Sequence, residues 1–540
     1  MNNQKGNEIA IQIQCTKKGF ERIFIEFSPC FSFKIYPFSI FYHIESIHNF
    51  MIEIIKVITL LGMRHLSGAI YGLIRSKLLA YFIGPIGVGL FSQAKTFLQF
   101  LDQISTFGSK GGVLKTIADY KNDVDHKKLT SFIGGVLVFF GLTGTIISIV
   151  CIFFSTSISN WIFNDAQYAW IISIVSVASV FYIEYYLIYL IFQGISKWNK
   201  YFLVSIIGDI VSTLITAAAI IYWNIKGAII SFLFCNTLLF LISFIALNRT
   251  FKEEKIPGFK SASLSISSIR QLIRFIGPLS TKAFVEYASL LLLRSEIIRQ
   301  IGMNASGIFQ IAYGTSILYM EIFSQLLFSY GIPKLTTHVG SYLEMNKVQN
   351  NLLRLGIIIL SPLTLLLLVS RQFWIPLLYD FSFLSAASLL IWQFSGDILR
   401  IIRTSITSSL LPLERFWVIN INEFFYWFCW IVFMKILIPH LGILAVGVGY
   451  FLANLALLPV IFIYHYKYLG YKLSKQSIYL LLKALPLVGI GFWIANQKDL
   501  NLVSIIGTII IIIFMIVFLP SKKDFQEVLI IIKNYRKKIA

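Results

Sequence analysis

The sequence has little charge, few cysteines and no nucleotide-binding or zinc-protease motif. Only 13% of its 540 residues are charged and 57% are hydrophobic, which excludes an ordinary soluble domain and is typical of a polytopic membrane protein. The five cysteines form no Cys-x-x-Cys pair, so we interpret them as small core residues rather than disulfides or metal ligands. No His-Glu-x-x-His and no Gly-x-x-x-x-Gly-Lys-Ser/Thr occurs. We therefore expect no cofactor, no metal and no ATP bound at a P-loop.

The charge that is present is mostly basic, with 46 lysines and arginines against 25 acids and a formal net charge of +21. These residues are scattered through short loops and form no module typical of nucleic-acid binding, so we expect no nucleic-acid partner. Membrane proteins collect lysine and arginine in cytoplasmic loops. The basic loops alternate with loops that carry little charge, and we expect both termini to be cytoplasmic. The basic segments lie near 121–128, 197–200, 249–270, 334–347, 467–475 and 522–538.

Apolar runs of about 20 residues recur along the chain, each long enough to cross about 30 Å of hydrocarbon. They predict an all-α polytopic membrane protein with about fourteen helices. The predicted ranges are 54–82, 88–116, 130–154, 168–192, 202–222, 227–248, 271–295, 305–332, 351–370, 383–410, 415–436, 441–466, 477–495 and 501–520.

The longest loop, the basic linker at 249–270, divides the predicted helices into two equal sets. Residues 54–248 and 271–466 hold six helices each, and bundles of equal size are typical of transporters built from repeats. Residues 467–520 add a further helix pair.

The two ends of the chain differ from the helical part. Residues 521–540 form a basic tail, which we expect to be cytoplasmic. Residues 1–53 mix charges with phenylalanine-rich pieces, and we predict no membrane span there. We interpret them as an N-terminal extension and expect Met51 to be the natural start.

The predicted helix at 383–410 carries charges where a lipid-facing helix would have none. At 100° per residue, Gln393, Asp397, Arg400 and Arg403 gather on one side. A charge at the bilayer centre costs roughly 2.5–3.5 kcal/mol on insertion scales. Three charges on one helix should therefore face partner charges or a watery cavity.

Polar stripes on other predicted helices could line the same cavity. Such stripes hold a bundle together or form a functional lumen. We favour the structural role for Asp209, Glu184 and Glu423, and we leave both roles open for Lys282 and Glu286, which lie four residues apart. Repeated arginines with few nearby acids instead favour an anionic ligand. The residues that we assign to a cationic lumen, besides those at 383–410, are Arg64, Arg75, Lys95 and Lys282, with the acids Asp102, Glu286 and Glu321.

The lumen assigned in this way has six basic and four acidic side chains, a net charge of +2. That sign suits a phosphate or diphosphate group, which arginine binds in a forked geometry. The acids either hold the arginines in place or take up a coupling proton, and the sequence leaves both roles open.

A glycine-proline hairpin follows the first predicted helix, at Gly84, Pro85, Gly87 and Gly89. The glycines permit backbone angles denied to other residues, and Pro85 stiffens the turn. The hairpin is either a tight external turn or a gate element that moves.

Several motifs occur in the order in which a known family has them. They include Gly307-Ile308-Phe309-Gln310 and, most strongly, Trp392-Gln393-x-x-Gly396-Asp397-x-x-Arg400. Together with the segments 77–90 and 112–120 they resemble Wzx-type O-antigen and enterobacterial-common-antigen flippases. These belong to the multidrug/oligosaccharidyl-lipid/polysaccharide exporter superfamily, and the resemblance covers roughly residues 54–466.

The resemblance implies two six-helix bundles and a flippase of the bacterial inner membrane. Such a protein moves an undecaprenyl-diphosphate-linked oligosaccharide from the cytoplasmic to the periplasmic leaflet, by alternating access driven by an ion gradient or the membrane potential. It implies a lipid-linked substrate, contact with membrane lipids and an optional polysaccharide polymerase partner. The alternatives are a drug or metabolite exporter of the same superfamily and, as an enzyme, a polymerase or glycosyltransferase. We expect no enzyme, because the predicted external loops are short and their acids stand singly.

Overall fold

A computed structural model describes residues 38–121, 126–254, 278–495, 509 and 511–513. Contacts divide the chain into two units, Met1–Ile54 and Ile55–Ala540. The side chains described below all belong to the second unit. The tail at 521–540 and most of the linker at 249–270 lie outside the described residues.

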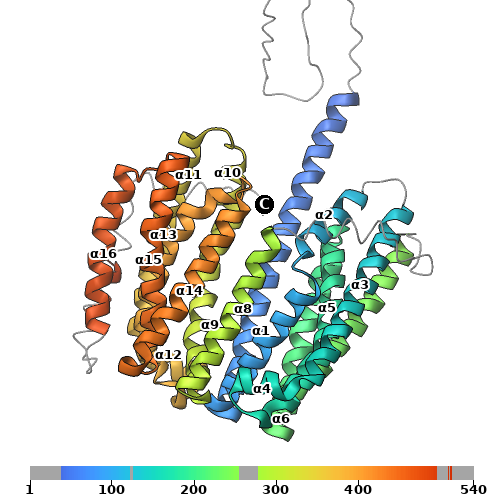
Figure 1. Ribbon diagram of the computed structural model, residues 1–540. Helices are drawn as coiled ribbons and strands as arrows, with labels where there is room; N and C mark the ends of the chain where they lie inside the picture. Colours follow the sequence, from blue (N-terminus) through green and yellow to red (C-terminus); the bar gives the residue numbers. More distant parts are fainter. Residues whose placement is uncertain (1–37, 122–125, 255–277, 496–508, 510, 514–540) are drawn as a thin grey trace, which may run out of the picture. The chain divides into compact units, whose positions relative to one another are not determined.

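Every secondary-structure element in the described ranges is helical, which confirms the predicted all-α class (Figure 1). The long helices are α1 (Phe38–Ser105), α3 (His126–Phe153), α5 (Ala169–Gly194), α6 (Trp198–Glu253), α8 (Pro278–Gln300), α9 (Met303–Leu326), α11 (Tyr342–Val369), α13 (Ala386–Thr407), α14 (Phe416–Leu441), α15 (Leu444–Leu469) and α16 (Lys475–Ala495). The shorter ones are α2 (Lys110–Lys121), α4 (Ser155–Phe163), α10 (Ile332–Thr336) and α12 (Arg371–Leu378), with single turns at η1 (Ala166–Tyr168), η3 (Leu327–Gly331), η4 (Phe381–Phe383) and η5 (Ser408–Leu410).

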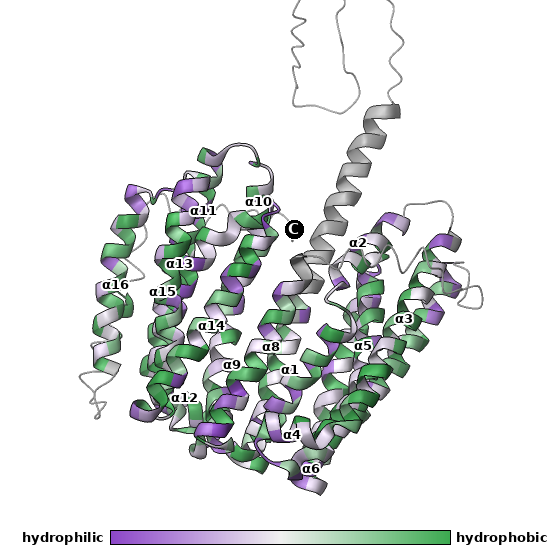
Figure 2. Ribbon diagram, in the orientation of Figure 1, coloured by the Kyte–Doolittle hydropathy of each residue, from purple (hydrophilic) through white to green (hydrophobic). Residues whose placement is uncertain are grey.

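Nine helical stretches in the described part of the chain are long and apolar enough to cross a membrane. Figure 2 shows hydrophobic residues along most of their lengths. The protein is therefore a polytopic membrane protein, as predicted. The nine do not include α8 or α13, which carry more charge. The count of fourteen stays a prediction, because 501–520 lies almost wholly outside the described residues.

Two of the long helices are broken by a single residue, close to predicted boundaries. Gly84, with φ 59° and ψ −171°, interrupts α1 between the predicted helices 54–82 and 88–116. Asn224, with φ 50° and ψ −132°, interrupts α6 in the same way. Glycine reaches such angles readily, and asparagine is among the residues that tolerate positive φ best.

Other predicted boundaries are wrong. The range 88–116 is not one helix, because positive φ values of 49° at Phe107 and 60° at Gly108 separate α1 from α2. At its other end, α1 begins at Phe38 rather than 54. The helix α11 also starts earlier than the predicted 351. The prediction missed its first residues because hydropathy marks only the apolar part of a helix.

Packing groups the helices by neighbourhood in the sequence. The helices α3 and α6 both contact α5, and α13 and α14 both contact α15 as a second set. The appended helix α16 packs mainly on α11. The predicted domain bounds at 54–248, 271–466 and 467–520 stay a prediction.

Candidate anion site

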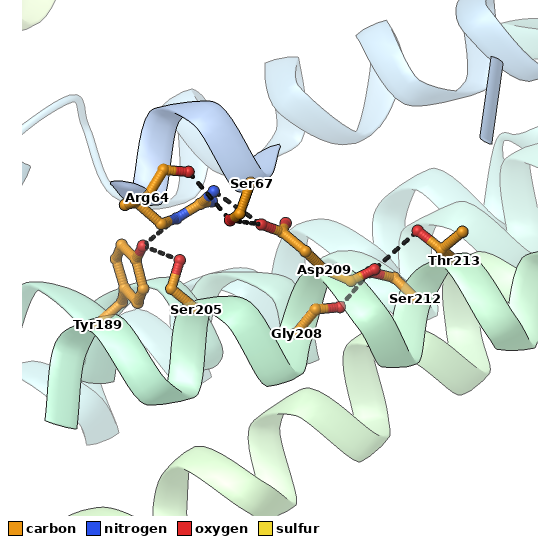
Figure 3. Close-up of polar contacts among 8 residues, drawn as sticks. All are labelled: Arg64, Ser67, Tyr189, Ser205, Gly208, Asp209, Ser212 and Thr213. Atoms are coloured by element: carbon orange, nitrogen blue, oxygen red, sulfur yellow. Dashed lines mark hydrogen bonds and ion pairs between the residues drawn. The ribbon is translucent and has the colours of Figure 1, made fainter. Parts of the chain in front are cut away.

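Arg64 on α1 belongs to an ion-pair network with α5 and α6 (Figure 3). Its Nη1 donates to Asp209 Oδ2 at 2.8 Å, and its Nε donates to the Tyr189 hydroxyl at 2.8 Å. Ser67 donates to the same Asp209 oxygen at 3.1 Å, and Tyr189 donates to Ser205 at 2.7 Å. The network ties α1 to its neighbours and neutralises Arg64. The expectation that Arg64 lacks a nearby acid is therefore wrong, whereas Asp209 has the structural contact predicted for it.

A cavity of about 190 Å³ lies between the two arms of α1 and α9. Arg75 from the first arm and Lys95 from the second both line it, together with Ser92 and Gln310. The Lys95 side chain is solvent-accessible, and no hydrogen bond joins Arg75 or Lys95 to another described side chain. The structure thus brings together two of the predicted lumen cations. None of the lining residues is acidic.

A third cation, Arg294 of α8, stands directly behind this cavity. Its side chain is only 2% exposed. One guanidinium nitrogen donates to Ser92 at 2.8 Å and the other donates to Gln310. The guanidinium also lies 5.1 Å from the centre of the Phe309 ring, within cation–π range. Both polar partners line the cavity, so Arg294 orients them and adds its charge to the field there.

Sequence reasoning missed Arg294, because it stands at the end of the predicted helix 271–295 and resembled a boundary residue. Lys95 lies within electrostatic range of both Arg75 and Arg294. The three cations therefore form one cluster, to which α1 contributes two members and α8 one. A concentration of positive charge without a lining acid is suited to a multivalent anion.

Asp397 of α13 is fully buried and accepts hydrogen bonds from three hydroxyl groups. Ser316 donates at 2.6 Å, Tyr319 at 2.6 Å and Tyr450 at 2.6 Å. These hydroxyls come from α9 and α15, so the carboxylate fixes α13 between them. Arg400 lies within electrostatic range of Asp397, so removing either side chain would leave the other as an uncompensated buried charge.

The remaining polar residues of α13 differ in their surroundings. Arg403 stacks over the Tyr426 ring at 4.4 Å from its centre. Arg400 is in electrostatic range of Tyr426 and of Tyr313. Tyr313 in turn lies 5.9 Å from the Arg294 guanidinium. The predicted cations of α13 thus connect to the α1–α8 cluster through an aromatic residue.

Gln393, also on α13, is 1% exposed, and neither atom of its amide group has a hydrogen-bond partner in the described part of the chain. An unsatisfied buried amide is costly. The predicted contact of Gln393 with a polar ligand stays a prediction, and Gln393 does not line the cavity of Arg75 and Lys95.

The predicted acids are dispersed. Asp102 pairs with Lys110 of α2, which also lies 4.0 Å from the centre of the Tyr186 ring. Glu321 accepts a hydrogen bond from Gln325 at 2.7 Å. Among the described residues, no group of three or more acids, cysteines or histidines is placed to hold a metal ion.

Lys282 and Glu286 of α8 do not form an ion pair in the described structure, although their spacing allows one. Glu286 lies within electrostatic range of Lys282, Glu423 and Arg400. Its carboxylate therefore lies close to one cation of α13 as well as to the lysine on its own helix. Glu423 accepts a hydrogen bond from Trp427 at 3.1 Å.

The glycine-proline hairpin packs against the start of α9. A Cβ atom added to Gly307 would lie 1.9 Å from the Pro85 carbonyl oxygen, and one added to Gly89 would lie 2.5 Å from the Met303 carbonyl oxygen. Only glycine permits backbones to approach this closely. A Cβ added to Gly84 would meet open space, and one added to Gly87 would lie closest to the Ile83 side chain, at 2.6 Å. The hairpin is thus a contact surface between α1 and α9, directly beside the cavity.

Comparison with known families gives the class of the protein. A family model described as "Polysaccharide biosynthesis protein" matches residues 54–331, which is more than half of the chain. The chain belongs to this family. It is also 22% identical to the lipid III flippase of Escherichia coli (strain K12) over 332 residues, which cover 61% of this chain and 78% of the relative. The lipid III flippase of Shigella flexneri matches to the same extent.

Solved structures of transport proteins share the fold. The lipid II flippase MurJ in an inward closed conformation superposes with a TM-score of 0.69 at 16% identity, covering 87% of this chain and 100% of that one. An inward-facing multidrug resistance MATE family transporter of the MOP superfamily gives 0.65 at 13% identity, covering 76% and 98%. The resemblance inferred from motifs is thereby confirmed. These similar proteins are flippases and transporters rather than enzymes.

Proposed function

We propose that the protein is a flippase that moves a lipid-diphosphate-linked oligosaccharide across the bacterial inner membrane. The observation that carries this proposal is the cluster of Arg75, Lys95 and Arg294 at one cavity without a lining acid. A diphosphate offers several charged oxygens to such a cluster. The similarity to a lipid III flippase supports a lipid-linked substrate.

In this mechanism the cavity holds the diphosphate and the first sugars while the polyprenyl tail stays in lipid. Arg75 and Lys95 bind the phosphate oxygens directly. Arg294 orients Ser92 and Gln310, which supply neutral hydrogen bonds. The hairpin at Gly84–Gly89 opens and closes one side of the cavity against α9. Such alternating access exposes the site first to one leaflet and then to the other.

The finer parts of the proposal rest on the family resemblance and on charge. They are an O-antigen or similar repeat unit as cargo, movement from cytoplasmic to periplasmic leaflet, and cytoplasmic termini. Arg400 and Arg403 extend the binding surface, with Gln393 and Lys282 near the sugars. Glu286 and Asp397 are the candidate coupling groups for an ion gradient, and a polysaccharide polymerase is the candidate partner.

The test is translocation in proteoliposomes. A lipid-diphosphate oligosaccharide is placed in one leaflet and its arrival in the other is followed, with and without an imposed pH or voltage gradient. We expect transport by the natural protein and at least a tenfold loss in Arg75→Ala and Lys95→Ala. Lys252→Ala is the matched control, because Lys252 is an exposed lysine that does not line the cavity.

Equal activity of Arg75→Ala, Lys95→Ala and the control would refute the anion site. Export of cationic dyes with no movement of the lipid would favour the exporter alternative. The sign of the cavity argues against that outcome, since three cations repel a cationic drug.

A further inference from the structure

A second basic cavity lies far along the chain from the first, where α11 and α16 begin. It measures about 390 Å³ and is lined by Asn346, Lys347, Asn350, Arg354, Lys472 and Gln476, among others. A volume of this size holds a small-molecule group rather than a single ion. The lining includes three cations and no acid.

The framework of this cavity is held in place by hydrogen bonds. Asn350 donates to the Lys472 carbonyl at 3.0 Å and accepts from the Ser474 amide at 2.8 Å. Arg354 donates to Asn351 at 2.9 Å and to Gln476. Side chains of α11 therefore fix both the loop before α16 and the first turn of that helix. The wall is built before any ligand arrives, which lowers the entropy cost of binding.

The lysines that line this cavity differ in whether a nearby acid pairs with them. Lys347 pairs with Glu344 at 2.6 Å, but both side chains are largely exposed, and such surface pairs are weak. Lys472 is exposed and forms no ion pair with a described residue. The first turn of α16 contains no acid, and the positive end of its dipole adds to the field. The cavity is thus ready to receive a negative group.

The surroundings indicate a lipid as the source of that group. Both α11 and α16 are candidate membrane spans that start at the cavity. Immediately beyond it, α16 exposes Tyr479 at 62% and Leu482 at 68%. A molecule with a phosphate in the cavity could lay an acyl chain along these residues. Basic pockets between membrane helices bind anionic headgroups in this way.

We propose that this cavity binds the phosphate-bearing headgroup of an anionic glycerophospholipid and so fastens the appended helix α16 to α11. The site is separate from the cavity of Arg75 and Lys95 and does not depend on the function proposed above.

The test is native mass spectrometry of the full-length protein, freed of co-purified lipid and titrated with phosphatidylglycerol, phosphatidylethanolamine or inorganic phosphate. The variant is Lys347→Ala with Lys472→Ala. The matched control is Lys252→Ala with Lys467→Ala, which removes two exposed lysines outside the cavity. A second variant, Lys347→Gln with Lys472→Gln, removes both charges but keeps polar side chains only one atom shorter. Each variant is compared with the parent by its melting temperature without lipid.

We expect phosphatidylglycerol to bind the parent and the control with the same Kd and to bind both cavity variants about 30-fold more weakly, since each lysine contributes about a fivefold factor. Phosphatidylethanolamine should bind more weakly than phosphatidylglycerol in the parent. Equal losses in variant and control, or no loss in either cavity variant, would overturn the proposal. Binding of inorganic phosphate that phosphatidylglycerol does not displace would overturn the lipid assignment.

Discussion

The substitution Gly307→Ala tests whether the hairpin at Gly84–Gly89 is a gate. The added Cβ would lie 1.9 Å from the Pro85 carbonyl oxygen and 2.7 Å from its carbon. Both neighbours are backbone atoms, so no side chain can rotate away. Overpacking of this kind costs roughly 1–3 kcal/mol. Because only the closed contact bears this cost, the open state should gain by about 5- to 150-fold in relative population.

Cysteine accessibility measures this shift. Ser76 lines the cavity, and Ser76→Cys in a cysteine-free background reports its opening to a membrane-impermeant maleimide added on the side of Pro85. We expect faster labelling when Gly307→Ala is added. Gly111→Ala and Gly489→Ala are the controls, because a Cβ at either position meets nothing within 4 Å.

Unchanged labelling in a protein that folds like the parent would refute the gate, because the closed contact would then have absorbed the methyl group at no cost. A fall in melting temperature without faster labelling would also contradict it, since the strain would then act on the fold as a whole. Faster labelling in the controls would show that the probe does not report this contact.

The remaining predictions concern the buried charges. Arg400→Ala should abolish transport, while Arg400→Lys should retain part of it, because charge survives but the forked geometry is lost; full activity of a membrane-inserted Arg400→Ala would refute its role. Asp209→Ala should lower the melting temperature more than the double variant Arg64→Ala/Asp209→Ala, because the single change leaves a partly buried arginine unpaired; equal shifts would mean that the pair contributes nothing. Asp397→Leu should destabilise the protein by roughly 3 kcal/mol or more, because three buried hydroxyls lose their acceptor. The measurement is thermal unfolding in detergent, and the melting temperature of Asp397→Asn should lie between those of the parent and Asp397→Leu.

Much of the helix pattern could be predicted from hydropathy, because an uninterrupted run of about 20 apolar residues is rarely anything but a membrane-spanning helix. The motif around Gln393, Asp397 and Arg400 was also visible, since charge on an apolar helix is conspicuous. Hydropathy could not show where a helix continues beyond the apolar region, as α1 and α11 do. It also could not show the break at Phe107, which depends on two positive φ angles in succession.

The partners of the charges could not be predicted, because they are tertiary contacts. Arg64 and Asp209 are 145 positions apart and meet only when α1 packs on α6. Arg294 belongs to the cationic cluster because it donates a hydrogen bond to Ser92, which lies 202 positions away in the sequence. Its place near the end of a predicted helix gave no signal. A search for every arginine within one turn of a predicted span boundary would have found Arg294, together with arginines that do not belong to the cluster.

The placement of the cationic cluster affects the transporter when it carries nothing. Arg75 and Lys95 stand on different arms of α1, and Arg294 lies behind them bonded to Ser92, so three like charges stay close together around an empty cavity. An anionic cargo cancels that repulsion. The loaded protein therefore passes through the closed state more easily than the empty one. If the cargo is the lipid proposed above, this bias disfavours cycles in which the transporter moves nothing.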